Sequence, residues 1–201
     1  TQERGFSFLL DAPLDMRFDP KNPVRAMDLV NNLSVGELAD ILYQYGEERR
    51  ARQVSRLIVE SRPIHTTRQL ADIVSRGTSS GRKGLHPATR TFQALRIAVN
   101  QELSALEAVL PQAVASLTPG GRLAIIAFHS LEDRIVKRYF QQESRDCICP
   151  PRQPKCTCGH HAQIQLIHRR PIRPQTSEVD ENPRARSAKL RVAEKLQPDI
   201  G

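Results

Sequence analysis

Four cysteines gather in one short Pro-rich segment, as Cys147-Ile-Cys149 and Cys156-Thr-Cys158. Four thiolates within about 4 Å of one another can bind a zinc ion tetrahedrally. A C-x-C pair must turn tightly to present both sulfurs to one metal, since paired zinc ligands are usually separated by two or more residues. A loop without metal and a disulfide-bonded loop are the alternatives, although nothing in the sequence directs the chain to an oxidising compartment. The tentative zinc ligands are Cys147, Cys149, Cys156 and Cys158.

A second group of chemically active side chains follows an apolar run. His129, Ser130 and Asp133 come directly after residues 123–128, which are predicted to form a buried strand. Open α/β sheets bind ligands at the carboxyl ends of their strands, so this position indicates a substrate site. Ser130 with Asp133 three residues later is also the pattern of a helix capping box, which would serve stability alone. His129 lacks that explanation and is either a site residue or a packed, hydrogen-bonded histidine.

Charged side chains also gather on a Pro-punctuated loop near the amino terminus: Asp11, Asp15, Arg17 and Asp19. Their spacing suits a carboxylate cluster at a site. The alternative is that they are simply solvated, as charges on surface loops commonly are. We take Asp11, Asp15 and Arg17 as tentative substrate-binding residues.

The chain is basic, with a formal net charge of +8 over 201 residues, and arginine supplies most of the positive charge. This balance favours an anionic polymer as partner, and guanidinium groups suit phosphates and bases. Some of these arginines lie on one face of a predicted helix. The default interpretation is a solvated helix face with a Glu48–Arg52 pair. A basic surface that follows an RNA backbone is the alternative. Its tentative contacts are Arg49, Arg52, Arg56, Arg82, Lys83 and Arg90.

No motif completes a cofactor or hydrolase site. Gly120-Gly121 precedes a predicted strand, whereas a nucleotide-binding glycine loop follows one, and the sequence has no P-loop, G-x-G-x-x-G or Ser nucleophile elbow. No run reaches the roughly 18 to 20 apolar residues of a membrane span, and residues 1–17 lack the apolar block of a secretory signal. We therefore expect a soluble, cytoplasmic protein.

The elements that position these residues follow from periodicity and punctuation. Capping boxes at Ser34 and Thr66 begin two helices, of which the first is expected to run to about Ser61. Residues 92–110 form one apolar helical stripe, which Pro111 should kink or break. The run 123–128 is expected to be buried on both faces of a largely parallel sheet and to lead into a helix to about Phe140, as half of a βαβ unit. The remaining predicted elements are a mobile basic loop at 76–84 and strands at 163–168 and 189–194.

Six strings in order resemble the bacterial 16S ribosomal RNA cytosine-N4 methyltransferases. The resemblance spans nearly the whole chain, and six ordered strings are far more specific than any one of them. The strings are Arg4-Gly-Phe-Ser-Phe8, Asp11-Ala-Pro-Leu-Asp-Met-Arg17, Tyr45-Gly-Glu-Glu-Arg49, His86-Pro-Ala-Thr-Arg-Thr-Phe-Gln93, Phe128-His-Ser-Leu-Glu-Asp-Arg134 and Asn182-Pro-Arg-Ala-Arg-Ser-Ala-Lys-Leu-Arg191.

The resemblance implies an α/β fold: the carboxyl-terminal part of a class I, Rossmann-like, S-adenosylmethionine-dependent methyltransferase domain with an all-helical insertion. The implied division is the end of a first methyltransferase segment at 1–23, a helical substrate-recognition insertion at 24–85 and a second segment at 86–201. The implied activity is methylation of the N4 amine of a cytosine in the decoding region of 16S RNA, with the small ribosomal subunit as partner and a homodimer left open.

In that family the main S-adenosylmethionine contacts precede the Arg4 string. The resemblance therefore implies that they lie upstream of Thr1, that no cofactor-binding residue falls in this chain and that the isolated chain is inactive. No general base is assigned. Two other functions remain open: a non-catalytic, zinc-stabilised RNA-binding module, and an assembly factor that docks on ribosomal protein. RNA binding without cofactor affinity would favour the module, and binding insensitive to ribonuclease would favour the assembly factor.

Overall fold

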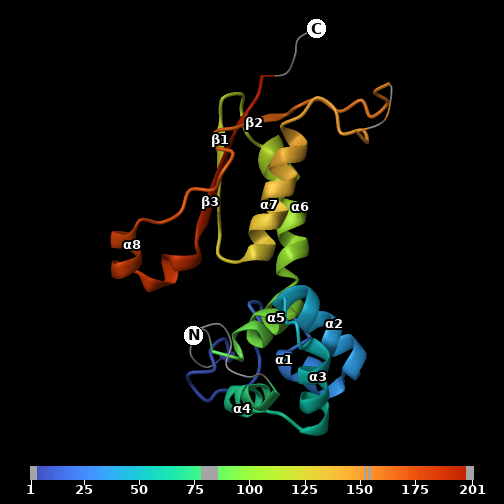
Figure 1. Ribbon diagram of the computed structural model, residues 1–201, viewed down its shortest axis with the longest axis vertical. Coiled ribbons are helices and arrows are strands. Elements are labelled where there is room, and N and C mark those ends of the chain that lie inside the picture. Colours follow the sequence, from blue (N-terminus) through green and yellow to red (C-terminus); the bar gives the residue numbers. More distant parts are fainter. Residues whose placement is uncertain (1–3, 78–85, 152, 154, 198–201) are drawn as a thin grey trace. The chain divides into compact units, whose positions relative to one another are not determined.

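The computed structural model describes residues 4–77, 86–151, 153 and 155–197 (Figure 1). The chain divides into two compact units, residues 1–102 and 103–201, and each is described by itself. Within the described ranges, no helix has both the length and the apolar character needed to span a membrane.

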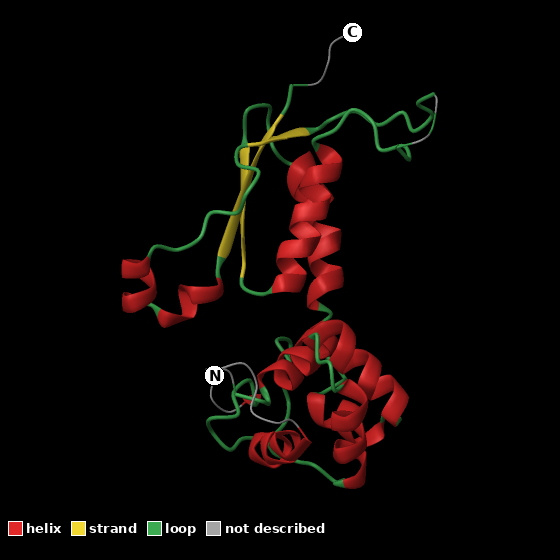
Figure 2. Cartoon of the chain, in the orientation of Figure 1, coloured by secondary structure: helices red, strands yellow, loops and turns green. Residues whose placement is uncertain are grey.

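The first unit is helical (Figure 2). Its core is formed by large aliphatic side chains with almost no exposure, among them Leu38, Leu42, Ile58 and Leu95. Burial of such side chains supplies most of the folding free energy of a helical unit. Its helices are α1 (Ala26–Asn32), α2 (Val35–Gly46), α3 (Ala51–Glu60), α4 (Thr67–Gly77) and α5 (Thr89–Asn100).

Both predicted capping boxes are confirmed. At α2, Glu37 N donates to Ser34 Oγ at 3.3 Å and Ser34 N donates to the Glu37 carboxylate at 2.8 Å. At α4, Gln69 N donates to Thr66 Oγ1 at 3.3 Å and the Gln69 side chain accepts from Thr66 N at 3.2 Å. These bonds satisfy amide groups that a helix start leaves without partners, so the local sequence is sufficient to place both starts.

The single helix expected from Ser34 to about Ser61 is wrong, because two helices separated by a turn occupy this range. Glu47 ends α2 in the left-handed conformation, with φ of 49°. A Cβ on Gly46 would lie 2.6 Å from the carbonyl oxygen of Arg90, so only glycine permits this approach of α2 to α5. The turn between α2 and α3 lets both helices bury a face in the same core.

The long helix expected over residues 92–110 is also divided. α5 ends at Asn100, and Gln101 adopts φ of 50° before α6 (Glu102–Ala115) begins. Asn100 Nδ2 donates to Met16 O, and its Oδ1 accepts from Phe18 N, both at 2.7 Å. These tertiary bonds fix the end of α5. Pro111 lies inside α6, so the break that was one of its two predicted effects does not occur.

The second unit is a small sheet with two long helices on one face (Figure 2). Its strands have the order β1-β3-β2, and β3 pairs antiparallel with both neighbours, with Arg122 opposite Glu194 and Ile164 opposite Lys195. Besides α6, its elements are β1 (Arg122–Ala127), α7 (Ser130–Glu143), β2 (Ile164–Leu166), α8 (Thr176–Glu181), the 3-10 helix η2 (Pro183–Ser187) and β3 (Lys189–Lys195).

The expectation of a largely parallel sheet buried on both faces is wrong for these strands. Burial alternates along β1, with Ile126 57% exposed, so only one face of this strand is covered. The βαβ expectation holds in a modified form: β1 and β2 point in the same direction and α7 connects them, while antiparallel β3 lies between them. The fold of the unit is therefore mixed α/β, with Phe140 of α7 and Ile164 of β2 in its core.

Candidate functional site

Asp15 and Arg17 form one tight pair in the loop that precedes α1. The Asp15 carboxylate accepts from Arg17 Nε at 2.7 Å and from Nη2 at 2.9 Å. Arg17 Nη1 also donates to the carbonyl oxygens of Pro20 and Asn22, at 2.8 and 2.7 Å. The hydrogen bond from Arg17 lowers the pKa of Asp15 and outweighs the opposing effect of burial. These two predicted site residues are thus brought together, and they hold the shape of the loop.

Asp11 lies apart from that pair, beside a small pocket of about 350 Å³. Its Oδ1 accepts a long 3.4 Å bond from Arg68 N in the first turn of α4. Thr67 fixes the backbone here, because its Oγ1 donates to Leu10 O at 2.7 Å and accepts from Ala12 N at 3.1 Å. The pocket is also lined by Ala12, Pro13, Met27, His65 and Thr66. Asp11 is therefore an acidic residue of this loop that lines a pocket.

Aromatic contacts and one close backbone approach bring together three of the strings that carry the family resemblance. Phe8 stacks on His86 with 4.4 Å between ring centroids and meets Phe92 edge-on at 5.2 Å. Gly5, at φ of +70°, lets the first string approach the second, since a Cβ there would lie 2.3 Å from Pro13 O. The strings are thus packed against one another beside the Asp11 pocket.

An arginine-lined groove of about 530 Å³ lies where α2 meets α3. Tyr43 is 66% exposed and lines it together with Arg49, Arg50 and Arg52. Arginine beside an exposed aromatic ring is a combination that binds single-stranded RNA, through phosphate contacts and base stacking. We call this the arginine groove. Sequence analysis missed Tyr43 and Arg50, although the position of Tyr43 off the apolar stripe of α2 was a signal for its exposure.

The other predicted backbone contacts lie outside the groove lining. Arg56 is exposed further along α3. Arg90 pairs with the buried Glu48 at 3.9 Å, so the expected Glu48–Arg52 pair is replaced by one that links the α2–α3 turn to α5. Arg82 and Lys83, with most of the loop predicted at 76–84, fall outside the described residues.

His129, and not Ser130, is the N-cap of α7, so the predicted Ser130–Asp133 capping box is wrong. Phe128 N and His129 N donate to the Glu132 carboxylate at 2.8 and 3.2 Å, and Glu132 N donates to His129 Nδ1 at 3.4 Å. The box is thereby shifted one residue towards the strand. An imidazole nitrogen replaces the usual hydroxyl or carboxylate acceptor, which is why the sequence pattern gave no sign of it.

The shift leaves the Asp133 side chain available for the central strand. Its carboxylate accepts from Lys189 Nζ at 2.9 Å and from Arg191 Nε at 2.7 Å. Burial raises the pKa of Asp133, but the bonds from Arg191 and Lys189 outweigh it and the net pKa is lowered. Lys189 and Arg191 were missed as partners, although their i,i+2 spacing on a predicted strand places both on one face.

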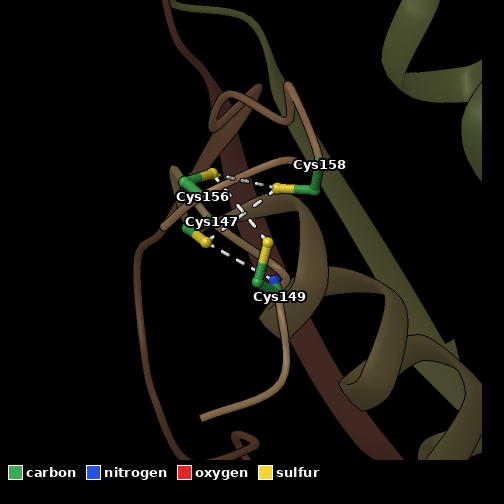
Figure 3. A group of neighbouring side chains, drawn as sticks. All are labelled: Cys147, Cys149, Cys156 and Cys158. Carbon is green, nitrogen blue, oxygen red and sulfur yellow. Dashed lines mark hydrogen bonds between the residues drawn. The ribbon is translucent and has the colours of Figure 1, made fainter. Parts of the chain in front are cut away.

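The four cysteines converge in the loop between α7 and β2 (Figure 3). Their sulfur atoms all lie within 4.8 Å of one another. All four thiols are free. Backbone amides of Ile148 and His160 lower the pKa of Cys158 to about 6. We call these four residues the thiol cluster.

Comparison with known proteins places the chain in one protein family. The model of the MraW methylase family matches residues 1–196. The chain is 56% identical to the ribosomal RNA small subunit methyltransferase H of Thermomicrobium roseum, covering 98% of this chain and 61% of that protein. The proteins of the same name from Dehalococcoides mccartyi strain BAV1 and Heliobacterium modesticaldum are 53% and 50% identical, each over 97% of this chain and over 56% and 64% of their own lengths.

The chain therefore belongs to the MraW methylase family. It spans 56% of the length of the D. mccartyi relative and 61% of that from T. roseum.

Proposed function

We propose that the whole protein transfers the methyl group of S-adenosylmethionine to the exocyclic N4 of a cytosine in the decoding region of 16S ribosomal RNA, within the small subunit. The family match over residues 1–196 carries this proposal, because it runs through both units. The printed name of the relatives, ribosomal RNA small subunit methyltransferase H, supports the substrate class.

Within this proposal, residues 24–85 are a helical insertion that recognises substrate, and residues 86–201 are the second segment of a class I methyltransferase domain. The all-helical content of α1 to α4 and the strand-helix-strand order of β1, α7 and β2 support this proposal. The compact units divide later than the proposed segments, at residue 102, because α5 packs into the core of the helical unit. A strand that leads directly into a helix presents the residues at its end to a ligand. Of the strand-end group, we retain His129 and Ser130 as proposed substrate contacts. We retain Asp133 as a positioning residue, because its carboxylate oxygens already accept from Lys189 and Arg191.

The arginine groove is the proposed RNA-binding surface of the helical unit. Arg49, Arg50 and Arg52 provide guanidinium groups for phosphates, and the exposed ring of Tyr43 provides a stacking face for an unpaired base. Sequence-specific RNA recognition commonly targets unpaired nucleotides, because their bases can stack on aromatic side chains. Arg56, Arg82, Lys83 and Arg90 stay proposed contacts with the RNA backbone outside the groove.

Asp11 is the proposed acceptor for the target amine. A carboxylate accepts hydrogen bonds from the N4 amino group of cytosine, and the Asp11 carboxylate lines a pocket. A base enclosed in RNA structure must first turn out of its neighbours to enter such a pocket. Methyl transfer then requires the amine nitrogen in line with the methyl group, so the acceptor acts by orientation. Asp15 and Arg17 act as positioning residues that hold the loop.

The test uses the intact gene product with S-adenosylmethionine and small subunits that lack the modification, followed by mass spectrometry of the nucleosides. We expect one N4-methylcytidine per 16S RNA. Asp11→Asn should lower kcat roughly hundredfold with RNA affinity retained, because the amide presents a weaker acceptor to the amine. Asp19→Asn, in the same loop, is the matched control, because the Asp19 carboxylate caps the local turn at Lys21 N and is not among the pocket-lining residues. RNA binding without any methylation would favour the non-catalytic binding module instead.

A further inference from the structure

Three sulfur-sulfur distances in the thiol cluster are close to the edge of a tetrahedral zinc site, and all the sulfur atoms lie within 4.8 Å of one another. Cys149 Sγ lies 3.9 Å from Cys156 Sγ, Cys156 Sγ 3.5 Å from Cys158 Sγ, and Cys158 Sγ 3.9 Å from Cys147 Sγ. A zinc ion at about 2.3 Å from four sulfurs requires an edge of about 3.8 Å between them. A disulfide requires about 2.05 Å, so the observed spacing is that of metal ligands. Figure 3 shows the four sulfur atoms turned towards a common centre.

Backbone amides surround the sulfurs as they do in thiolate metal sites. Cys149 N donates to Cys147 Sγ at 3.4 Å, and Thr157 N donates to Cys149 Sγ at 3.5 Å. Such bonds orient the ligands and stabilise their negative charge. Each C-x-C pair thus makes the tight turn that is required to present both of its sulfur atoms to one metal ion. Gly159 follows the second pair with φ of 58°.

Among its described residues, the loop that carries the cluster bonds to the rest of the unit at its base. Gln163 N donates to Glu143 O at 2.8 Å, Ala162 N donates to Asp146 Oδ1 at 3.2 Å, and His160 Nε2 bonds Gln142 O at 3.1 Å. Beyond the base, none of the described residues from 144 to 163 is buried. Apolar burial therefore cannot order the tip of this loop, and a cross-link between the two C-x-C pairs can.

We propose that Cys147, Cys149, Cys156 and Cys158 bind one zinc ion in a structural, four-thiolate site that holds the loop between α7 and β2 in a single conformation. A tetrahedral set of four thiolates selects zinc or iron among common metals, and four protein ligands leave no open position for catalysis. The site is independent of the methyl-transfer proposal, because it requires neither the Asp11 pocket nor the arginine groove.

The first experiment measures metal content by inductively coupled plasma mass spectrometry, with the full chain purified under reducing conditions from zinc-supplemented cells. We expect about one zinc ion per chain. Replacement by Co²⁺ should give the intense visible bands of tetrahedral cobalt and sulfur-to-cobalt charge transfer in the near ultraviolet. Cys147→Ser and Cys158→Ser should each lose the charge-transfer intensity and most of the bound metal. His161→Gln, an exposed histidine of the same loop, should keep both.

A second measurement covers the case in which a cysteine variant folds poorly. Trypsin cleavage after Lys155 in the wild-type chain should be roughly tenfold faster after zinc is removed with a chelator, and zinc should restore protection. Circular dichroism should change little, because no loop residue belongs to the core cluster of this unit. Four reactive thiols without metal, a disulfide in the purified chain, or iron in place of zinc would each overturn the proposal.

Discussion

Oδ1 of Asp133 accepts a 2.7 Å hydrogen bond from Nε of Arg191, which joins the first turn of α7 to the central strand β3. The two side chains are only 13% and 10% exposed, so water screens the pair weakly. Lys189 bonds the other carboxylate oxygen. The end of β1 is therefore fixed by a strand that comes much later in the sequence, and two of the family strings meet in this contact.

Asp133→Asn should destabilise the second unit by about 2 kcal/mol, because it removes charge-assisted bonds and leaves two cations without their partner. Chemical unfolding and amide hydrogen exchange of β3 would measure this. Arg122→Gln is the matched control in the same sheet, since the Arg122 side chain of its ion pair with Glu194 is 65% exposed. That variant should change stability by less than about 1 kcal/mol. Equal losses in both variants would contradict the assigned importance of Asp133.

The lowered pKa of Asp133 predicts acid sensitivity of the second unit. In the unfolded chain this carboxyl titrates at about pH 3.9, and in the folded protein at a lower pH. Its contribution is therefore complete above the unfolded pKa and is lost as pH falls through the folded pKa. The free energy of unfolding should decline below about pH 4. The free energy of unfolding of Asp133→Asn should decline less steeply with falling pH. Identical slopes for the variant and the wild-type protein would count against this pKa assignment.

Gly46→Ala should destabilise the helical unit by about 1 to 3 kcal/mol, because its Cβ would meet the backbone of α5 at Arg90 O. Gly36→Ala in the same helix is the control. A Cβ there meets only Ser34 Oγ, at 3.9 Å, so it should stabilise α2 by about 0.5 to 1 kcal/mol. The thermal unfolding midpoints of the two variants should shift in opposite directions from that of the wild-type chain. A shift of the same sign would show that α5 yields to the added methyl group.

Substitutions in the arginine groove should separate charge from stacking. We expect Arg49→Gln and Arg52→Gln each to remove about one phosphate contact with a single-stranded RNA oligonucleotide. The slope of the logarithm of the binding constant against the logarithm of the salt concentration should then fall by about one for each variant. Tyr43→Ala should weaken binding by about 1 to 3 kcal/mol at every salt concentration, with the slope unchanged. Fluorescence anisotropy titrations at several salt concentrations measure both quantities. Arg76→Gln on α4, also exposed, is the control expected to change the slope least.

The features that sequence analysis predicted best are those fixed by nearby residues. The helix starts at Ser34 and Thr66 depend on side chains three positions apart, so their boundaries could be read from the chain itself. The helix ends at Glu47 and Gln101 could not, because a positive φ at a non-glycine residue is imposed by tertiary contacts. Asn100 shows this directly, through its bonds to the backbone at Met16 and Phe18.

The candidate site shows the same division. Residue types alone selected Asp11 and the four cysteines, and the structure adds the pocket beside the first and the convergence of the others. The role of Asp133 was out of reach, because its partners follow 56 and 58 residues later. Because the cap is His129, Glu132 takes part in the capping box and the Asp133 carboxylate bonds Lys189 and Arg191.

Because of its strand order, the small sheet can form only after β3 has been synthesised. Among the described strands, β3 comes last in the sequence and is the one that pairs with both of the others. Arg122 on β1 faces a residue that follows it by 72 positions. While a nascent chain ends before Lys189, β1 and α7 have already left the ribosome without the strand that connects them. Such an intermediate exposes strand edges and is prone to aggregate. Nascent chains stalled with residues 189–195 inside the ribosome, and chains stalled after these residues have emerged, should therefore differ sharply in protease resistance and in capture by chaperones.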